Sequence, residues 1–338
     1  MSKPAPYTLT RDASLADRNT FRVPARAAWY AELHDATELP ELLAQPEVKS
    51  LPLLVLGGGS NLLFTKDFEG LVLRVAVTGI AREGGRVRVG AGERWNGFVR
   101  WSLQQGLAGL ENLTLIPGTV GAAPIQNIGA YGAEVREYVH AVEAWDRKQG
   151  KLIVLGNADC RFGYRDSLFK HEPGRYILTA VEFEFPQEHA LKLGYAGIDK
   201  ELSAQGVKQP TPADVARAVE ALRRRKLPDP VQIGNAGSFF KNPVLPAARA
   251  VDLARANPGL PVYPAGADRV KLSAAWLIEA CGLKGAREGD AGVSEQHALV
   301  LVNHGTATGA QIWALAQRVR DAVESRFGVR LEPEPIVL

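Results

Sequence analysis

The first half of the chain consists mainly of short apolar or alternating runs that are typical of β-strands. Apolar residues dominate 51–56 (LPLLVL) and 70–77 (GLVLRVAV), residues 86–92 (RVRVGAG) alternate with period two, and a strand pattern returns at 178–186 (LTAVEFEFP). Such alternation indicates a strand with one buried face. Residues 94–107 instead carry apolar side chains near one helical face, so we predict a helix among these strands.

Helix signals dominate the second half of the chain. Thr211 is a suitable N-cap for a helix that carries an apolar stripe and that Pro228 ends. Two more helices are predicted over residues 273–281 and 308–327, whereas two prolines keep the last eight residues, LEPEPIVL, extended. Strands first and helices later predict an α+β fold, and 338 residues are enough for two or three domains.

Composition narrows the class of protein. A formal charge of only +3 does not suggest a nucleic-acid-binding protein, and no apolar run is long enough to span a membrane. Cys160 and Cys281 are too far apart in sequence to suggest a metal pair or a disulfide framework, and the six histidines show no metal-binding spacing. We therefore expect no metal site. Residues 1–19 lack the apolar core of a signal peptide, so we expect a cytoplasmic protein.

A glycine loop, GGGSN at residues 57–61, directly follows the first apolar strand. Gly57 and Gly59 match the start of a dinucleotide-binding G-x-G-x-x-G motif, but the third position is Leu62 and another strand follows instead of a helix. A Rossmann site is therefore excluded. A nest of backbone N–H groups that binds an anion and a plain β-turn both remain compatible with this loop.

A second small-residue segment, IPGTVGAAPIQNIGAYG at residues 116–132, has four glycines, three alanines and little charge. Its backbone can lie against a flat or extended ligand, whereas its isoleucines and valine argue against a solvated linker. Two such loops on an α+β scaffold suggest one large ligand that contains a pyrophosphate.

Several polar residues are candidates for chemistry, each with a structural alternative. Arg165 is suited to bind a carboxylate, or it is a surface arginine. Ser238 lies in the crowded GNAGSFFKNP segment without a nucleophile-elbow motif, so a buried turn serine is the alternative to a catalytic one. Glu332 and Glu334 occur on the extended tail, which is compatible with a solvated terminus. The basic run at 223–226 suits the end of a helix, where cations complement its dipole.

Taken together, these segments resemble the UDP-N-acetylenolpyruvoylglucosamine reductase family, also called UDP-N-acetylmuramate dehydrogenases, of bacterial cell-wall synthesis. The resemblance covers the chain from about residue 19 to its end, with the motifs in family order. The matching motifs are NTF, LGGGSNLLF, GLENLTLIPGTVGAAPIQNIGAYG, CRFGYRDSLFK, KLPDP, GNAGSFFKNP, WLIEACGLKG, HALVLVN and LEPE.

The resemblance implies a FAD-binding fold of the vanillyl-alcohol-oxidase type with an added substrate domain. The three expected parts are a first FAD subdomain at 1–68 joined by the tail 329–338, a second at 69–228, and a substrate domain at 229–328. The glycine loop would face the FAD pyrophosphate and the second segment would line the flavin. The implied FAD-binding residues are Gly57, Gly58, Gly59, Ser60, Asn61, Leu62, Pro117, Gly118, Gly121, Ala122, Ala123, Gln126, Gly129 and Tyr131.

The implied chemistry is a NADPH-dependent reduction of the enolpyruvyl sugar nucleotide through FAD. Arg165 would stabilise the developing enolate, Glu334 would act as an acid near the carboxylate, and Ser238 would protonate the carbon. Lys226 and Asn242 match the positions that bind the substrate diphosphate in the family. Tyr195 resembles the tyrosine that closes over the nucleotide in the tyrosine-loop subclass, and Lys284 would also reach the substrate site.

We further expect a monomer that binds neither nucleic acid nor membrane, with the arginines of the basic run on the surface. Two other functions are weighed beside the reductase: an oxidase of the same fold and a flavin- or sugar-nucleotide-binding protein without turnover. The GNAGSFFKNP motif argues against the first, and the retention of Arg165, Ser238 and Glu334 argues against the second.

Overall fold

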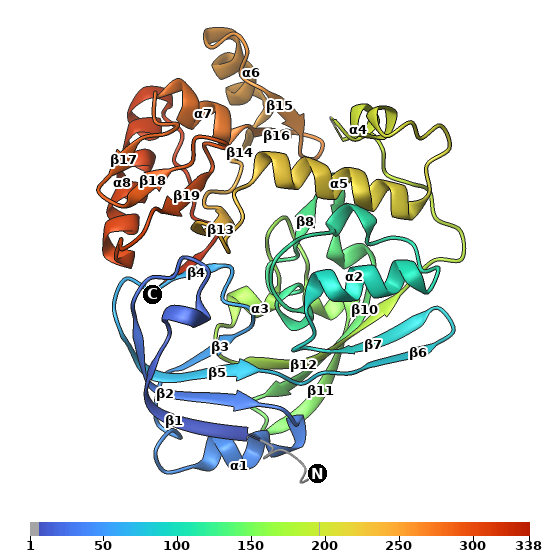
Figure 1. Cartoon of the computed structure of the whole chain (residues 1–338), viewed down its shortest axis with the longest axis vertical. Coiled ribbons are helices and arrows are strands. Elements are labelled where there is room, and N and C mark those ends of the chain that lie inside the picture. Colours follow the sequence, from blue (N-terminus) through green and yellow to red (C-terminus); the bar gives the residue numbers. More distant parts are fainter. Residues whose placement is uncertain (1–6, 196) are drawn as a thin grey trace. The chain divides into compact units, whose positions relative to one another are not determined.

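The computed structural model describes residues 7–195 and 197–338 (Figure 1). The chain divides into two compact units, each made of several segments. The first unit contains 26–59, 68–225 and the N-terminal strand, and the second contains 14–25, 60–67 and 226–338. The first six residues of the predicted subdomain 1–68 lie outside the described residues, and the three-part division stays a prediction.

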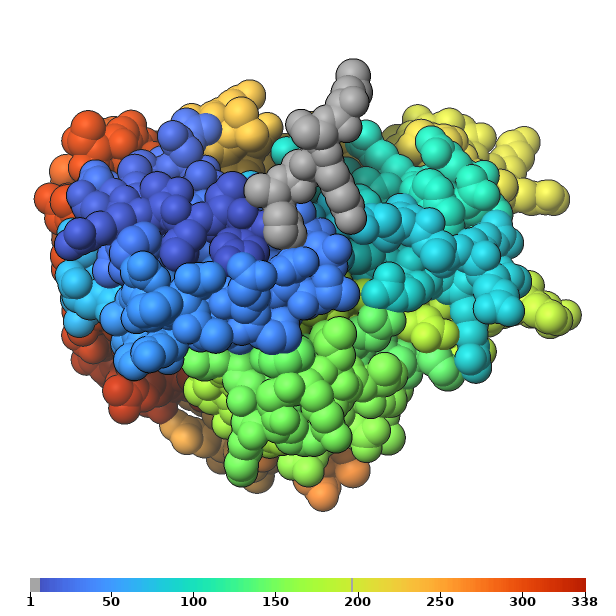
Figure 2. All heavy atoms as spheres, turned by 90° about the horizontal axis from the view of Figure 1, so that it is seen from below, coloured from blue at the N-terminus to red at the C-terminus, as the bar shows by residue number. Residues whose placement is uncertain are grey.

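A four-stranded sheet in the first unit has the strand order β1-β2-β5-β3. The strands are β1 (Tyr7–Ser14), β2 (Arg26–Leu33), β3 (Leu53–Leu56) and β5 (Phe68–Val75). Both β2 and β3 run parallel to β5, and the short helix α1 (Leu39–Ala44) packs on the apolar core of this sheet. Figure 2 shows blue residues from the N-terminal part of the chain and green residues near position 150 on the viewed face.

A five-stranded antiparallel sheet forms the rest of the framework of the first unit, in the order β11-β10-β12-β7-β6. Its strands are β6 (Ile80–Glu83), β7 (Arg86–Gly90), β10 (Val139–Asp146), β11 (Lys151–Gly156) and β12 (Tyr176–Glu184). In β7 the valines are buried and the arginines exposed, as the period-two pattern predicts. Trp95 and Phe98 of α2 (Trp95–Gln104) pack into the same core.

The second unit combines two small sheets with helices. One sheet has the order β13-β19-β18-β17, and the other has the order β14-β16-β15. Their strands are β13 (Gly234–Ser238), β14 (Val244–Pro246), β15 (Val262–Pro264), β16 (Arg269–Leu272), β17 (Arg287–Glu288), β18 (Ala291–Val293) and β19 (Val300–Asn303). The helices are α6 (Ala247–Ala256), α7 (Ala274–Ala280) and α8 (Gly309–Phe327).

The long helix α8 begins and ends as the sequence predicts. Thr308 and Gln311 form a reciprocal capping box, and Gly328 ends the helix with a φ of 63°. A Cβ atom at Gly309 would lie 1.6 Å from the Phe64 carbonyl oxygen, so only glycine permits the first turn to contact that backbone. The helices predicted near residues 94–107, 211–228 and 273–281 are likewise present as α2, α5 (Pro212–Lys226) and α7.

The C-terminal tail returns to an early segment of the chain. The two-residue strands β4 (Leu62–Leu63) and β20 (Ile336–Val337) pair in parallel, and the Thr65 N–H donates to the Leu338 carbonyl. The extended tail expected from its prolines is thus a strand partner for residues directly after the glycine loop. The remaining short elements are α3 (Leu168–His171), α4 (Ile198–Ala204), the hairpin of β8 (Gly129–Ala130) and β9 (Ala133–Glu134), and several 3₁₀ turns.

Candidate active site

The glycine loop lies directly against the second small-residue segment within the first unit. A Cβ atom at Gly57 would lie 2.7 Å from the Thr119 hydroxyl oxygen. One at Gly58 would lie 2.9 Å from the Gly118 Cα atom. Real side chains do not pack this closely, so glycine is what allows the two backbones to meet. The two loops predicted to share a ligand are therefore adjacent, and their backbones fit a pyrophosphate-containing group such as FAD.

The second segment and Leu115, the residue directly before it, also hold non-glycine residues in left-handed backbone geometry. Leu115, Asn127 and Tyr131 have φ angles of 57°, 46° and 49°. This geometry is uncommon for a leucine or a tyrosine and is found where the surroundings hold the backbone for a purpose. The segment is thus built as a shaped surface, as a ligand-lining loop requires.

Two predicted FAD-binding residues have their side chains in the protein interior. Leu62 is 6% exposed and Ala123 is 1% exposed. Leu62 pairs with Ile336 in the second unit, and Ala123 belongs to the core of the first. Leu62 and Ala123 are therefore suited to contact a cofactor through their backbones and not through their side chains.

Arg165 is held against the second small-residue segment. Its guanidinium donates to the Gly129 carbonyl, and its own backbone is left-handed with a φ of 55°. Nearby links reinforce the contact, because Asn127 Nδ2 donates to the Gly163 carbonyl at 2.8 Å and the Ser167 hydroxyl donates to the Ile125 carbonyl at 2.5 Å. The first unit thus brings the predicted catalytic arginine to the predicted flavin-lining segment.

The second unit brings the segments of Ser238 and Glu334 together. Ser238 is the last residue of β13 and pairs with Val300 of β19. The next residue, Phe239, accepts a hydrogen bond at 2.8 Å from the Glu334 N–H, and Asn61 Nδ2 donates to the Glu334 carbonyl at 3.4 Å. Ser238 and Glu334 therefore lie on neighbouring segments joined by a backbone hydrogen bond, and both residues are half-buried.

The two carboxylates of the tail differ in environment. Glu332 is 73% exposed and forms an ion pair with Lys241 at 3.2 Å. Glu334 is half-buried instead, so its carboxyl group is less solvated than that of Glu332.

Tyr131 and Tyr195 contact each other in the first unit. Their rings meet edge to face with centroids 5.0 Å apart, and Tyr195 remains 48% exposed. Burial raises the pKa of Tyr131, so its hydroxyl stays protonated at neutral pH. A predicted substrate-binding residue thus lies beside a predicted flavin-lining one.

A cationic group in the second unit surrounds a histidine to which the sequence assigned no role. Burial lowers the pKa of His297, and the charges of Lys226 and Lys284 lower it further. The Leu299 N–H donates to His297 Nδ1, which places the ring proton on Nε2. The two lysines predicted to be substrate-binding residues therefore lie in the same neighbourhood as a neutral histidine. Lys284 also pairs with Glu279 at 3.3 Å.

Asn242 has one side of its amide already engaged. The Ala274 N–H at the start of α7 donates to Asn242 Oδ1 at 2.9 Å. This bond orients the side chain and directs its Nδ2 donors away from the helix. The arrangement is compatible with the predicted contact from Asn242 to a phosphate oxygen.

The basic run on α5 is not uniformly exposed. Arg224 and Arg225 lie on the surface and pair with Glu220 and Glu201, as expected. The expectation is wrong for Arg223, whose Nε is buried and has no hydrogen-bond partner among the described residues. Burial lowers the pKa of Arg223. Position 223 is four residues after Val219, so it lies on the buried face of the helix.

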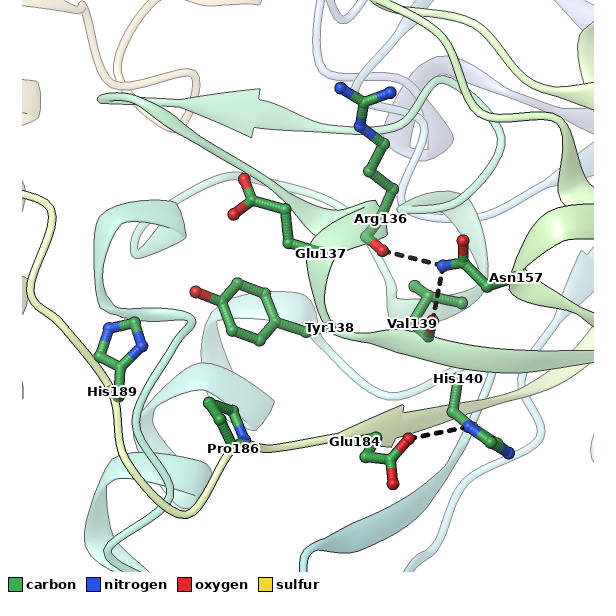
Figure 3. Close-up of a pocket in the computed structure, with 9 residues that line it drawn as sticks. All are labelled: Arg136, Glu137, Tyr138, Val139, His140, Asn157, Glu184, Pro186 and His189. Atoms are coloured by element: carbon green, nitrogen blue, oxygen red, sulfur yellow. Dashed lines mark hydrogen bonds and ion pairs between the residues drawn. The ribbon is translucent and has the colours of Figure 1, made fainter.

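The first unit also contains a pocket of about 490 Å³ that no sequence pattern predicts (Figure 3). Tyr138, His140 and His189 line it, and His140 pairs with Glu184. Behind it, His189 Nε2 lies 2.5 Å from the fully buried Glu111. No local pattern signals this contact, since the two residues are 78 positions apart.

Other chemistry is limited in the described part of the chain. Burial raises the pKa of Cys160 to about 12, so its thiol is unreactive at neutral pH. Residues 7–195 and 197–338 contain no cluster of three or more acidic, histidine or cysteine side chains able to hold a metal ion. Within the same ranges, every helix is too short or too polar to cross a bilayer.

Comparison with known proteins agrees with the fold. Residues 27–156 match the model of a FAD-binding domain, and residues 229–338 match that of the UDP-N-acetylenolpyruvoylglucosamine reductase C-terminal domain. A UDP-N-acetylenolpyruvoylglucosamine reductase of Chromobacterium violaceum is 55% identical over 97% of this chain and 98% of its own length. One of Xanthomonas euvesicatoria is 54% identical, with coverage of 98% and 97%.

A solved structure adds the same likeness in three dimensions. The reductase of the same name from Thermus caldophilus superposes with a TM-score of 0.68 at 27% identity and covers 98% of both chains. The predicted α+β flavoprotein fold is thereby confirmed. The chain belongs to the UDP-N-acetylenolpyruvoylglucosamine reductase family of FAD-dependent enzymes.

Proposed function

We propose that the protein reduces UDP-N-acetylglucosamine enolpyruvate to UDP-N-acetylmuramate with NADPH as the hydride donor, in the cytoplasm and as a monomer. The product is a peptidoglycan precursor, so the activity would serve cell-wall growth, cell shape and division. The observation that carries the proposal is the pairing of the Ser238 and Glu334 segments in a chain of this family. Two proton donors so placed suit an addition of hydride and proton across a carbon–carbon double bond.

FAD would be held through the backbones of residues 57–61 and 117–131. When bound, FAD supplies the hydride chemistry by taking a hydride from NADPH and delivering it to the enolpyruvyl methylene carbon. The two loops approach each other closely at Gly58 and Gly118, and their backbone N–H groups would bind the pyrophosphate.

The residues of the chain would make the poorly electrophilic double bond reactive. Addition of hydride leaves negative charge on the substrate carboxylate and the carbon beside it. The Arg165 guanidinium would stabilise that charge, and the Glu334 carboxylic acid would donate a hydrogen bond to the carboxylate. The Gly129 carbonyl holds the Arg165 side chain in place for this role.

The Ser238 hydroxyl would give its proton to the carbon and complete the lactyl ether. Serine is a weak acid, so its proton moves only to a strongly basic carbon that it contacts directly. This requirement explains why a serine without a histidine partner suffices. The diphosphate would be bound by Lys226, Lys284 and Asn242, and Tyr195 would cover the nucleotide.

The test is anaerobic NADPH oxidation by the FAD-loaded protein, with and without the sugar nucleotide. We expect one equivalent of NADPH to be oxidised per FAD alone, and continuous oxidation once the sugar nucleotide is added. Catalysis that needs oxygen would instead favour an oxidase of the same fold. Absence of flavin reduction by NADPH would favour a binding protein or another hydride donor.

A variant isolates the protonation step. Ser238→Ala should keep FAD and its reduction by NADPH but lose about 10²–10⁴-fold of sugar-nucleotide reduction. The matched control is Ser203→Ala, which removes an exposed hydroxyl from α4 and should behave like the wild type. Unchanged turnover in Ser238→Ala would remove the proton-donor role.

A further inference from the structure

The segment between β12 and α4 carries Tyr195 but has no regular secondary structure of its own over residues 185–195. A residue on such a segment is placed accurately only if side chains of the framework hold the backbone. In the first unit those side chains come from one short 3₁₀ turn, η3 (Glu111–Leu113), which lies within the GLEN part of the family motif.

The first anchor is a buried contact between His189 and Glu111. His189 Nε2 lies 2.5 Å from Glu111 Oε1, and their side chains are 9% and 0% exposed. Glu111 is itself held, because its other oxygen accepts from the Gly109 N–H at 2.6 Å. Gly109 contacts the Tyr138 ring so closely that a Cβ atom there would lie 2.3 Å from it. The acceptor for His189 is therefore part of a rigid framework.

The second anchor is Asn112, which joins the two tyrosine-bearing segments. Its Nδ2 donates to the Lys192 carbonyl at 2.9 Å and to the Tyr131 carbonyl at 2.8 Å. Asn112 is 1% exposed, and its Oδ1 has no hydrogen-bond partner among the residues described. The hydrogen bonds of the Asn112 side chain thus join the backbone of Tyr131 to the segment that carries Tyr195.

Apolar packing completes the attachment. Leu191 and Leu193 pack with Tyr131 against the small core of α4 and α5. Lys192, which lies between them, forms an ion pair with Glu137. Residues 191–193 are therefore attached both by apolar contacts and by an ion pair.

We propose that Glu111, Asn112 and His189 are positioning residues for sugar-nucleotide binding, because they hold Tyr195 against Tyr131. The inference rests on the proposed role of Tyr195 in covering the nucleotide. These three residues would not touch the substrate. They would determine the fraction of protein molecules in which Tyr195 lies in its binding position. Their loss would therefore weaken substrate binding more than it slows hydride or proton transfer.

The test compares four variants of the FAD-loaded full chain. His189→Ala and Asn112→Ala each remove one anchor. His189→Gln keeps a donor that reaches Glu111. The matched control is His140→Ala, because His140 lines the same pocket but pairs with Glu184, the last residue of β12, which precedes residues 185–195 (Figure 3).

Three readouts separate positioning from general damage. We expect KM for UDP-N-acetylglucosamine enolpyruvate to rise about tenfold in each Ala anchor variant, which corresponds to one charge-assisted or buried hydrogen bond. We expect kcat and the anaerobic reduction of bound FAD by NADPH to stay within about twofold of wild type. Hydrogen exchange in peptides covering 185–195 should accelerate in His189→Ala and Asn112→Ala, and return to the wild-type rate in His189→Gln.

The result that overturns the proposal is a wild-type KM and wild-type exchange in both anchor variants, or an equal change in His140→Ala. An equal loss in FAD reduction would also overturn it, since that points to damage of the whole unit. If wild type itself shows no turnover with the sugar nucleotide, the proposed function fails, and hydrogen exchange still decides whether the anchors hold the segment. If His189→Ala does not fold, Asn112→Ala and His189→Gln decide.

Discussion

The substitution Gly58→Ala tests the contact on which the FAD site depends. The added methyl group would lie 2.9 Å from Gly118 Cα, whereas carbon atoms pack comfortably at about 3.5–4.0 Å. One of the two loops must therefore move by roughly 0.6 Å or more, and the neighbour is backbone and cannot rotate away. Gly58 does not have a positive φ, so the alanine strains the contact and not its own backbone.

Overpacking of this kind costs about 1–3 kcal/mol. Because Gly58 is exposed and its loop can yield outward, we take the lower part of that range, about 1–2 kcal/mol. This corresponds to FAD binding that is weaker by about 5–30-fold. The assay is titration of apoprotein with FAD, followed by flavin fluorescence, together with urea unfolding of the apoprotein.

Gly97→Ala is the matched control. It adds the same methyl group within α2, where the nearest atom, Arg94 Cβ, is 3.7 Å away. Alanine is the better helix former, so this variant should be more stable by about 0.5–1 kcal/mol and should bind FAD normally. FAD affinity and stability at wild-type level in Gly58→Ala would refute the inference that close approach of these backbones matters.

Three further predictions concern charged groups. The Arg175 guanidinium beside Asp146 holds the pKa of that buried carboxylate well below its usual range, so the stabilisation is complete at neutral pH and is lost on acidification below about pH 4. Asp146→Asn should destabilise the protein by about 2–3 kcal/mol in urea at pH 7 and flatten its acid unfolding curve, and a wild-type curve would contradict this. Burial and two lysines lower the pKa of His297, so the unfolded chain takes up more protons there and stability falls as the pH drops below about 6.5. His297→Gln should remove that part of the pH dependence between pH 5 and 7, measured by urea unfolding. Arg223→Met should stabilise the ligand-free protein by about 1 kcal/mol of unfolding free energy, because it removes a cation whose Nε is buried without a hydrogen-bond partner among the described residues. The measurement is the melting temperature, which should rise. A lower melting temperature would show that other contacts of the guanidinium stabilise the protein.

Local signals predicted much of the fold. The alternation in β7, the capping box at Thr308 and the glycine after Phe327 act over a few residues, so their elements could be read from the chain. The adjacency of the two small-residue loops was also predictable, because both loops lack side chains that would keep their backbones apart.

Contacts between distant parts of the chain were not predictable in this way. Nothing near His189 indicates that its partner is Glu111, and nothing near Leu62 indicates that it pairs with Ile336. Arg223 is an intermediate case. Its spacing of four residues from Val219 was visible, but the charge run around it suggested a solvated surface.

The pairing of β4 with β20 has a consequence for how the chain is made. Residues 62–63 are synthesised long before residues 336–337, so their strand partner does not exist until residue 337 has been made. The second unit also needs residues 14–25, which are made still earlier. Assembly of this unit is therefore a late step that follows synthesis of residues 336–337, and the early segments lack these partners until then. In a nascent chain, residues 57–59 of the glycine loop could thus fold with the first unit before β20 has been translated. Residues 60–61 of the same loop belong to the second unit, which β20 completes.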